Sequence, residues 1–493
     1  MTTKTTMKTP DKKQTPSNPD EAAENQFIEE CLGAEELGDG ILYAYRYDGK
    51  FVFNKSSQQW LKWTGNHWSE DILDESLSAV EGVVQLYVKA LSILSLKEDF
   101  SDKKKKYFLR RMRKLRSEHG RQNCRKWAAT NPERPLAVLG EHLDQLPWLL
   151  ACANGVVDLR TGELQPGRPT DYLTKASPTE WESIDAPCPV WEKALGEIFA
   201  GEPELVAYVA RLFGYALTGI SKENILPILC GQGRNGKTMI VESISRVLGP
   251  LSGPIQAEML LDQGRSRSSA GPSPDIMALR GLRMAFASEA DEGRKFSPSR
   301  CKWLSGSDSL VGRAPHDRRE TQFRPTHTLI LLTNHKPQAP AADFAFWERI
   351  HLIPFNFSFV DREPKAEGEF RADKDLADKL EAEASGILAW LCRGCLRWHQ
   401  IGLAPPEVVK AATEKYRRDE DRLADFLEDR CIIHADAREP FKDLYENFEL
   451  WWHENVSKNV PSGIRFGKLL KAAKFKRLQS GGRYYQGLRL IRQ

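Results

Sequence analysis

Eight consecutive residues combine glycines, a lysine and a hydroxyl in an order that suits the binding of phosphate groups. They read Gly231-Gln232-Gly233-Arg234-Asn235-Gly236-Lys237-Thr238 and fit the pattern G-x-x-x-x-G-K-[ST]. Glycines let backbone N–H groups curl around phosphate oxygens. Lys237 is then expected to reach the β- and γ-phosphates of a nucleotide, and Thr238 to offer its hydroxyl to Mg²⁺. We therefore predict that all eight residues bind ATP.

The segments on either side of this loop support the prediction. An apolar run, 225–230, precedes it and is typical of a buried parallel strand. An amphipathic helix over 239–248 is predicted to follow. The amino end of such a helix carries a partial positive charge, which favours phosphate there.

Two further strands are predicted to end in polar residues that could act on the same nucleotide. The run 283–288 ends at Glu289, our candidate for holding Mg²⁺ or orienting water, and Asp291 and Glu292 could share that role. The alternative is that Glu289 is only a surface acid at a strand end. The run 328–333 ends at Asn334, whose amide would position the attacking water.

Basic side chains cluster in two parts of the chain although the net charge is only +3. From Lys458 to the end there are ten Lys and Arg residues and no Asp or Glu. A second cluster covers 103–116. Such clusters are common nucleic-acid footprints, and the alternative for each is a solvated helix face.

The C-terminal cluster falls on a predicted helix, 464–474, with one apolar and one basic face. A hairpin turning at Gly481-Gly482 is predicted to follow, which is the layout of a winged-helix-like DNA-binding domain. Lys468, Lys471 and Lys474 are its candidate DNA-binding residues. A basic packing module that binds no DNA is the alternative.

Length and composition bound the rest of the molecule. The chain has 493 residues, 41% of them hydrophobic and 28% charged, which predicts two to four globular domains. No apolar run approaches the roughly 20 residues of a membrane span, and no secretory signal is recognisable, so we expect a cytoplasmic protein with no membrane partner. Nine scattered cysteines argue against a disulfide framework, and Cys392 and Cys395 are expected to pack in a helix rather than bind zinc.

Five parts are predicted along an α/β chain. They are a disordered tail (1–22), an α+β N-terminal module (23–189), an ATPase domain (190–372), a helical connector (373–425) and the basic winged-helix-like domain (426–493). Within the N-terminal module we expect small β-structure over 38–70, including Ile41–Tyr45, then helices over 71–148, then a hairpin over 150–175. A Pro-bearing linker is expected at 185–189, and 373–400 is expected to be one long helical segment.

Several segments in order make the chain resemble the superfamily 3 helicases, in particular phage and plasmid primase-helicases and their poxvirus-type relatives. The segments are Asn154–Leu159 with Thr161-Gly162, Gly214–Gly219, Asp275–Arg283, Lys302–Asp308, Thr333–Pro337 and Asp343–Phe355. The likeness covers roughly residues 35–430. It departs from the family pattern at Ser307, where glycine is usual, and at Ser288, where the broader superfamily has a second acid.

The resemblance implies a P-loop fold of the AAA+ type and roles for further residues. Arg349 aligns with the arginine finger, which acts on ATP bound by the neighbouring subunit, although the family often has two arginines where this chain has Glu348-Arg349. Catalytic roles are thus implied for Lys237, Glu289, Asn334 and Arg349. Whether Glu289 binds the metal or acts as a base stays open.

The family also places a DNA-gripping hairpin in the central channel of its ring, between Asp308 and Pro325. Here a proline with clustered basic residues suits a loop that follows phosphates. Its DNA-binding candidates are Arg313, His316, Arg318 and Arg319. A solvated loop is the alternative.

These expectations combine into an ATP-dependent DNA helicase. The resemblance implies a hexameric ring that moves 3′ to 5′ on single-stranded DNA. ATP and Mg²⁺ are its expected cofactors. A separate primase or polymerase is an expected partner, since neither a priming carboxylate pair nor a nicking motif is recognisable. Two rivals are an origin-binding initiator whose ATP use controls assembly, and a regulatory or defence ATPase of the same fold.

Overall fold

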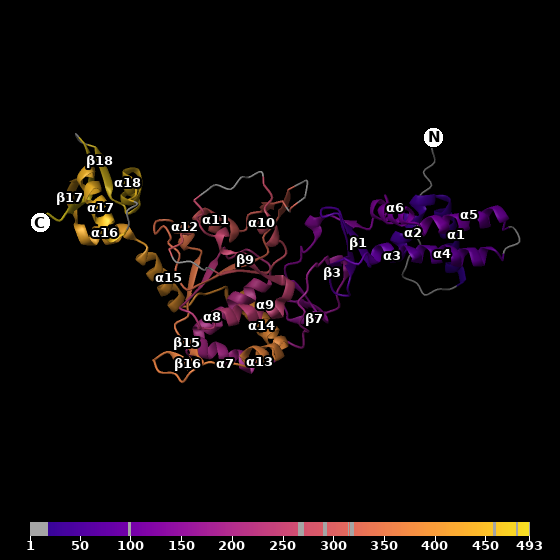
Figure 1. Cartoon of the computed structure of the whole chain (residues 1–493), viewed down its shortest axis with the longest axis horizontal. Helices are drawn as coiled ribbons and strands as arrows, with labels where there is room; N and C mark the ends of the chain where they lie inside the picture. The colour runs from indigo at the N-terminus through magenta and orange to yellow at the C-terminus, as the bar shows by residue number, and fades with distance from the viewer. Residues whose placement is uncertain are drawn as a thin grey trace.

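A computed structural model describes residues 18–96, 100–264, 271–288, 293–313, 315, 320–456, 460–479 and 482–492. Figure 1 shows three bodies in a row: a helical N-terminal module, a central α/β domain, and a small C-terminal domain joined to the centre by helix α15 (Glu407–Asp419). The chain therefore places its predicted nucleotide site in the middle body.

Helices form most of the N-terminal module. They are α1 (Asn18–Gly33), α2 (Glu35–Tyr47), α3 (Glu75–Ser78), α4 (Val80–Leu94), α5 (Asp102–Leu115) and α6 (Glu118–Thr130). A small sheet with the order β3-β2-β1-β4 adjoins them. Its strands are β1 (Phe51–Asn54), β2 (Gln59–Trp63), β3 (Trp68–Glu70) and β4 (Ala137–Val138). The small β-structure expected after residue 50 and the helices expected after 71 are confirmed.

Two predictions for this module were wrong. Ile41–Tyr45 is helical within α2, not a strand, and Ile41 to Ala44 are all buried. Residues 38–44 are buried in succession, so this helix contains a short apolar run, and such a run cannot be told from a strand by sequence period alone. The predicted tail, 1–22, also ended too late, because α1 begins at Asn18. Pro19 and the two acids that follow it are a helix-start signal.

The stretch Glu75–Leu94 is one helical segment long and apolar enough, by length and composition, to cross a membrane. This differs from the expectation that no such run exists. Val80, Val83, Val84 and Tyr87 on α4 are fully buried in the core of the N-terminal module, and these contacts account for the apolar sequence.

A three-stranded antiparallel sheet joins the module to the centre. It consists of β5 (Leu149–Cys152), β6 (Gly155–Asp158) and β7 (Glu163–Gln165), so the predicted hairpin is confirmed and gains a strand. Leu150, Val157 and Trp181 pack in the same core as helices of the central domain. Cys188, in the expected linker, is also buried there, so a division at 189/190 does not separate two cores.

The central domain is built on a five-stranded parallel sheet with the order β14-β8-β13-β10-β9. The strands are β8 (Leu226–Cys230), β9 (Ser252–Gln256), β10 (Met284–Ser288), β13 (Thr328–Thr333) and β14 (Ile350–Pro354). The three predicted apolar runs are thus confirmed as β8, β10 and β13. Parallel strands buried on both faces read as continuous apolar runs, which is why the sequence identified them.

Helices cover this sheet, and short elements project from it. The helices are α7 (Pro189–Ile198), α8 (Pro203–Leu217), α9 (Lys237–Leu248), α10 (Pro274–Ala278), α11 (Pro298–Leu304), α12 (Phe344–Trp347), α13 (Leu376–Ala382) and α14 (Ala384–Ile401). Two small two-stranded sheets pair β11 (Leu310–Gly312) with β12 (Thr321–Phe323), and β15 (Ser358–Val360) with β16 (Glu369–Arg371). The single helix expected over 373–400 is two helices, and α14 carries Cys392 and Cys395 fully buried in the core.

Both glycines of the Gly214–Gly219 segment lie where a side chain would clash with neighbouring atoms. A side chain on Gly214 would meet the backbone of Cys395 and Gly394, so this glycine lets α8 and α14 pack closely. Gly219 has φ +63°, and a side chain there would strike the guanidinium of Arg283. This family-like segment is therefore structural.

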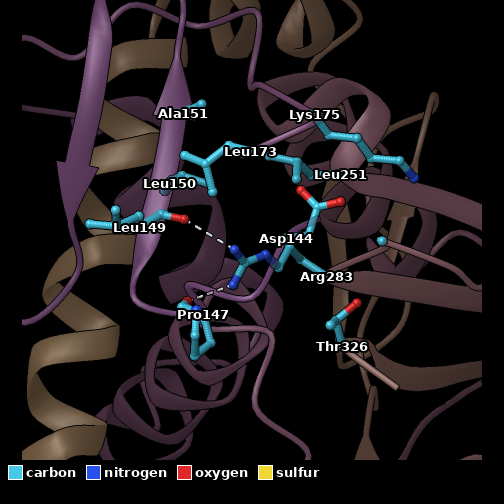
Figure 2. A pocket seen from close by; sticks show the side chains of 11 residues that line it. Asp144, Pro147, Leu149, Leu150, Ala151, Leu173, Lys175, Leu251, Arg283 and Thr326 are labelled. Carbon is cyan, nitrogen blue, oxygen red and sulfur yellow. Dashed lines mark hydrogen bonds between the residues drawn. The ribbon is translucent and has the colours of Figure 1, made fainter. Parts of the chain in front are cut away.

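Arg283 links the central sheet to the N-terminal half of the chain. Its guanidinium is buried and donates to the carbonyl oxygens of Pro147 (2.6 Å), Leu149 (3.0 Å) and Leu217 (3.0 Å). Figure 2 shows this group among the lining of a small cavity, with Asp144 beside it. Burial lowers the pKa of Arg283 to about 10, so the group stays charged near neutral pH.

The C-terminal domain has the predicted helix-and-hairpin layout. Its elements are α16 (Arg422–Arg430), β17 (Cys431–Pro440), α17 (Phe441–Asn455), α18 (Gly463–Ala472), β18 (Lys476–Gln479) and β19 (Arg483–Leu490). The strands form an antiparallel sheet with the order β17-β19-β18. Phe426, Phe448 and Phe466 centre its separate core. Strand β17 was not anticipated.

Candidate nucleotide site

Lys237 lies at the carboxyl edge of the parallel sheet, where the loop after β8 meets the end of β13. It is only 6% exposed. Its Nζ donates to the carbonyl oxygen of Gly231, to Asn235 Oδ1 (2.9 Å) and to Asn334 Oδ1 (3.1 Å). Ligands of open α/β sheets bind at this edge of the strands. The structure thus brings Lys237 and Asn334 together, although 97 residues separate them.

The backbone of the loop is shaped for close approach by an anion. Gly236 has φ +86°, and a side chain there would strike Ile198. Helix α9 begins at Lys237, so its free N–H groups lie next to the loop. Gln232, Gly233 and Arg234 are exposed. The arrangement can place several N–H donors and one cation around a phosphate.

Asn235 holds the loop in place through contacts that the loop pattern did not predict. It is 3% exposed and lies between Lys237 and the carbonyl oxygen of Phe355, to which its Nδ2 donates (3.4 Å). Phe355 N in turn donates to Cys230 O (2.8 Å). The residue that follows β14 thus helps to fix the loop that follows β8, a contact that depends on strand order and that no local sequence signal reveals.

Burial also shapes the chemistry of the lysine. Desolvation lowers the pKa of Lys237 below its usual value, because a charged amine loses hydration in the loop. A bound triphosphate would supply the negative charge that the site lacks. The loop is therefore built to gain stability from an anion.

The residues of the site fit a Mg²⁺ ion that is held mainly by the phosphates of a nucleotide. Thr238 is exposed in the first turn of α9. In the part of the chain that the structure describes, no group of three His, Cys, Asp or Glu residues could form a metal site of its own. Mg²⁺ is commonly held by substrate phosphates with one or two protein ligands. Thr238 could be one, and the predicted second ligand, Glu289, follows β10 directly but lies outside the described residues.

Arg349 lies far from this site within its own chain. It precedes β14, and its Nη1 donates to Asn224 O (3.2 Å) just before β8. Both strands then run five residues to the edge that carries Lys237, which is about 16 Å at the usual rise per residue. Arg349 therefore does not reach the nucleotide site of its own subunit.

Two neighbouring contacts hold the segment around Arg349. Lys302 pairs with Asp343 (2.9 Å), which also caps helix α12 through Phe346 N (3.1 Å). On the other side, Trp398 Nε1 donates to Glu223 Oε1 (2.7 Å), next to Asn224. The sequence did not reveal these contacts, since their partners come from distant parts of the chain.

The candidate DNA-binding residues fall into two groups. Strands β11 and β12 confirm the predicted hairpin, and Arg313 directly follows β11 at its loop end, with its N–H donating to Ser273 Oγ (2.9 Å). His316, Arg318 and Arg319 lie outside the described residues.

The second group is on and beside α18. Lys468 and Lys471 are exposed on this helix, whereas Lys474 lies beyond its end with φ +65°. The predicted helix 464–474 was thus too long by two residues. The chain reverses there, and Phe475 N donates back to Leu470 O (3.1 Å).

One family model and several viral proteins are similar to this chain. Residues 40–200 match the family described as D5 N terminal like. The chain is 27% identical over 334 residues to "Putative helicase L207/L206" of Acanthamoeba polyphaga mimivirus, covering 65% of this chain and 34% of that protein. It is 24% identical over 396 residues to "Putative helicase 022R" of Frog virus 3, covering 66% and 40%.

A third relative carries a different name. The chain is 23% identical over 341 residues to "Putative primase C962R" of African swine fever virus, covering 64% of this chain and 34% of that protein. Among solved structures, the apo C-terminal region of NrS-1 aligns over 90% of this chain and 96% of that one, with 10% identity and a TM-score of 0.44.

The chain therefore carries a D5 N terminal like domain at the head of an α/β domain with a parallel sheet. It is similar to viral proteins that carry the names "Putative helicase" and "Putative primase". It spans only about a third to two fifths of the length of these relatives.

Proposed function

We propose that this chain is an ATP-dependent DNA helicase of phage, plasmid or other mobile-element replication, with a superfamily 3 motor of the AAA+ type. The observation that carries the proposal is the meeting of Lys237 and Asn334 at the carboxyl edge of the parallel sheet. A lysine for the phosphates and an amide beside it are what triphosphate hydrolysis needs from a protein.

In this proposal the loop 231–238 binds ATP, and Mg²⁺ bridges its phosphates. Lys237 stabilises the charge that develops on the transferred group, and Thr238 is a ligand of the metal. Asn334 positions the attacking water. Glu289 acts as metal ligand or as base at the end of β10.

The position of Arg349 supports an oligomer. An arginine about one strand length from the phosphates of its own subunit can serve a nucleotide only in a neighbour. Head-to-tail contacts of this kind generate a ring when the rotation between neighbours closes, and we propose a hexameric ring. Arg349 would then stabilise the transferring phosphoryl group through its planar charge.

In this proposal, DNA is bound by two basic elements of the chain. The β11–β12 hairpin would follow single-stranded DNA, with 3′-to-5′ movement, through Arg313, His316, Arg318 and Arg319. The exposed Lys468 and Lys471 on α18, with Lys474, would bind duplex. A separate primase or polymerase would cooperate with the protein in the host cytoplasm.

A second candidate is an origin-binding initiator that uses ATP to control its assembly. The exposed basic face of α18 favours it, since a helix followed by a hairpin is a common reader of duplex DNA. The initiator would bind one duplex sequence and separate few strands.

One experiment distinguishes these candidates: ATP-dependent unwinding of a forked DNA duplex by the full chain. Lys237→Ala and the double variant Arg318→Ala/Arg319→Ala serve as comparisons. Unwinding by the native protein that both variants lose supports the helicase. ATP hydrolysis without unwinding, unchanged in the double variant, would remove the helicase proposal and leave an initiator or a remodelling ATPase.

A further inference from the structure

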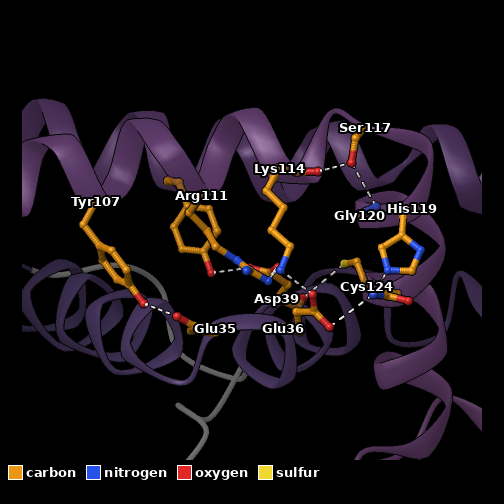
Figure 3. Close-up of polar contacts among 12 residues, drawn as sticks. Glu35, Glu36, Asp39, Tyr107, Arg111, Lys114, Ser117, His119, Gly120 and Cys124 are labelled. Carbon is orange, nitrogen blue, oxygen red and sulfur yellow. Dashed lines mark hydrogen bonds and ion pairs between the residues drawn. The ribbon is translucent and has the colours of Figure 1, made fainter.

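Helix α5 has two basic faces that behave differently. On the inner face, Arg111 is buried and pairs with Asp39 of α2, and Lys114 pairs with Glu36 (2.5 Å). Tyr107 OH donates to Glu35 Oε1 (3.2 Å). Figure 3 shows these contacts side by side between the two helices. The inner face is therefore neutralised by acids of the same module.

The outer face of α5 carries the residues that we call the outer stripe: Lys103, Lys106, Arg110 and Arg113. All four are exposed. Steps of three, four and three residues at about 100° each place them within a sector of roughly 80°. Within the described ranges of the chain, none of them has an ion pair with an acid. Four like charges thus line one side of a helix without compensation.

A face that served only solubility would not need this arrangement. Surfaces that only keep a protein soluble mix both signs of charge, and like charges three and four residues apart destabilise a helix. The same helix gives Lys104 and Arg116 acidic partners, Glu29 and Glu81. In the part of the module that is described, the acid of α5 that lies nearest the outer stripe is Asp102 in the first turn, and it forms no ion pair with a stripe residue. One carboxylate cannot balance four positive charges, so the stripe calls for a partner that supplies negative charge.

We propose that the outer stripe binds the phosphate backbone of duplex DNA. The stripe spans about 15 Å along the helix axis, and a duplex offers one phosphate charge per roughly 1.7 Å of its own axis. Proteins that hold single strands combine basic grooves with aromatic stacking. The aromatic residues of α5 do not serve this purpose, because Phe108 is buried and Tyr107 contacts Glu35. The stripe can follow a rigid backbone but offers no surface for stacked bases.

The proposed duplex contact on α5 is separate from the other candidate DNA-binding elements. In Figure 1, α5 lies in the helical module on the opposite side of the central sheet from the C-terminal domain. A duplex bound there would be held by the N-terminal module, apart from the β11–β12 hairpin and from α18. The inference does not depend on strand separation, since it requires only that DNA reaches this surface.

The first test measures protection of lysines in the full chain without ATP. Exposed lysines are acetylated with and without a blunt DNA duplex, and the modified residues are located by mass spectrometry. We expect protection of Lys103 and Lys106, and none of the exposed Lys193 and Lys374. Equal modification of Lys103 and Lys106 with and without duplex, or protection by single-stranded DNA alone, would overturn the proposal.

The second test uses matched variants that each lose four positive charges. One changes the outer stripe, as Lys103→Gln, Lys106→Gln, Arg110→Gln and Arg113→Gln. The other changes four exposed lysines elsewhere, as Lys193→Gln, Lys365→Gln, Lys374→Gln and Lys410→Gln. Glutamine has about the helix propensity of lysine and arginine, so both variants should fold.

We expect the stripe variant to bind duplex roughly 10- to 100-fold more weakly at low salt, with the slope of log affinity against log salt reduced by about 2–4. The control variant should resemble the native protein. Equal affinity and slope in the two variants contradict the proposal. Because neither measurement uses ATP, loss of the stripe effect and failure of the helicase assay are separate results.

Discussion

At the scale of single residues, the amine of Lys237 donates to three oxygen atoms of the protein. It is bound by Gly231, Asn235 and Asn334 within a site that burial makes unfavourable for positive charge. The amide of Asn334 thus lies where the terminal phosphate of a bound nucleotide would meet the lysine. Its effect on hydrolysis should therefore exceed its effect on binding.

We predict that Asn334→Ala lowers the kcat of ATP hydrolysis by on the order of 10²-fold, with a smaller change in KM, because a preorganised polar group acts chiefly on the transition state. Steady-state hydrolysis together with fluorescent-nucleotide binding measures both quantities. Asn356→Ala, an exposed amide near the same edge of the sheet, is the control. Parallel losses of binding and kcat would show that Asn334 only shapes the loop.

A second residue makes stability depend on pH. His327 is 4% exposed, its Nε2 contacts Leu304 O (3.1 Å), and burial lowers its pKa to about 4. The unfolded chain, with an ordinary histidine pKa near 6.5, binds a proton that the folded chain refuses. The contribution of His327 is therefore complete above pH 6.5 and is lost as the pH falls towards 4, by up to about 3 kcal/mol.

We expect His327→Gln to make the fall in unfolding free energy between pH 6.5 and 4 shallower by about one proton. Denaturant unfolding at several pH values in this window measures the slope. His453→Gln changes an exposed histidine and should leave the slope as it is. An unchanged slope in the His327 variant would mean that this imidazole gains its proton in the folded protein.

At the scale of elements, Arg283 connects three segments by one buried guanidinium. It precedes β10 and binds carbonyl groups before β5, within β5 and at the end of α8. We predict that Arg283→Met destabilises the protein by roughly 3–5 kcal/mol, because one buried and two half-buried carbonyl groups lose their donor. Denaturant unfolding measures this loss.

The nearby Arg280 provides the matched control for that prediction. It is half-buried and donates to one carbonyl, Gly140 O (3.1 Å), so Arg280→Met should cost about 1 kcal/mol. Limited proteolysis should also cut the Arg283 variant faster between the N-terminal module and β5. Similar losses of unfolding free energy in both variants would show that the contacts of Arg283 stabilise the protein no more than the single hydrogen bond of Arg280.

The elements also show what sequence can reveal. Buried parallel strands such as β8, β10 and β13 are continuous apolar runs, so their residues identify them directly. Strand β9 reads Ser-Gly-Pro-Ile-Gln and was missed, because it is an edge strand where glycine and proline are tolerated. Strand β17 carries charged residues and a register shift between Ile433 and Arg438, which hide its period.

Some features of the candidate site could also be predicted from the sequence, and others could not. The loop 231–238 is a local pattern, so residue type and spacing were enough to find it. The approach of Asn334 followed from the order of motifs along the chain. The contact between Asn235 and Phe355 and the separation of Arg349 from Lys237 depend on β14 lying beside β8, and strand order is not written in any local stretch of sequence.

At the scale of the whole molecule, the three bodies carry basic surfaces at separate places. The outer stripe is on the N-terminal module, Arg313 beside β11 is on the central domain, and α18 is on the C-terminal domain. A protein that handles a fork must hold duplex and single strands at once, and separate surfaces allow this. Linked weak contacts also raise the overall affinity beyond that of each one.

The last prediction concerns assembly, because Arg349 and Lys237 lie at opposite ends of neighbouring strands. Lys237→Ala and Arg349→Ala should each abolish most ATP hydrolysis. When equal amounts are mixed under conditions that allow exchange of subunits, roughly a quarter of the interfaces in a head-to-tail ring regain an intact pair. Hydrolysis should therefore recover to about that fraction. Mixing Lys237→Ala with the double variant Lys237→Ala/Arg349→Ala restores no interface and is the control. If sedimentation shows mixed oligomers but hydrolysis does not return, Arg349 does not act on the nucleotide of a neighbour, and the ring loses its main chemical argument.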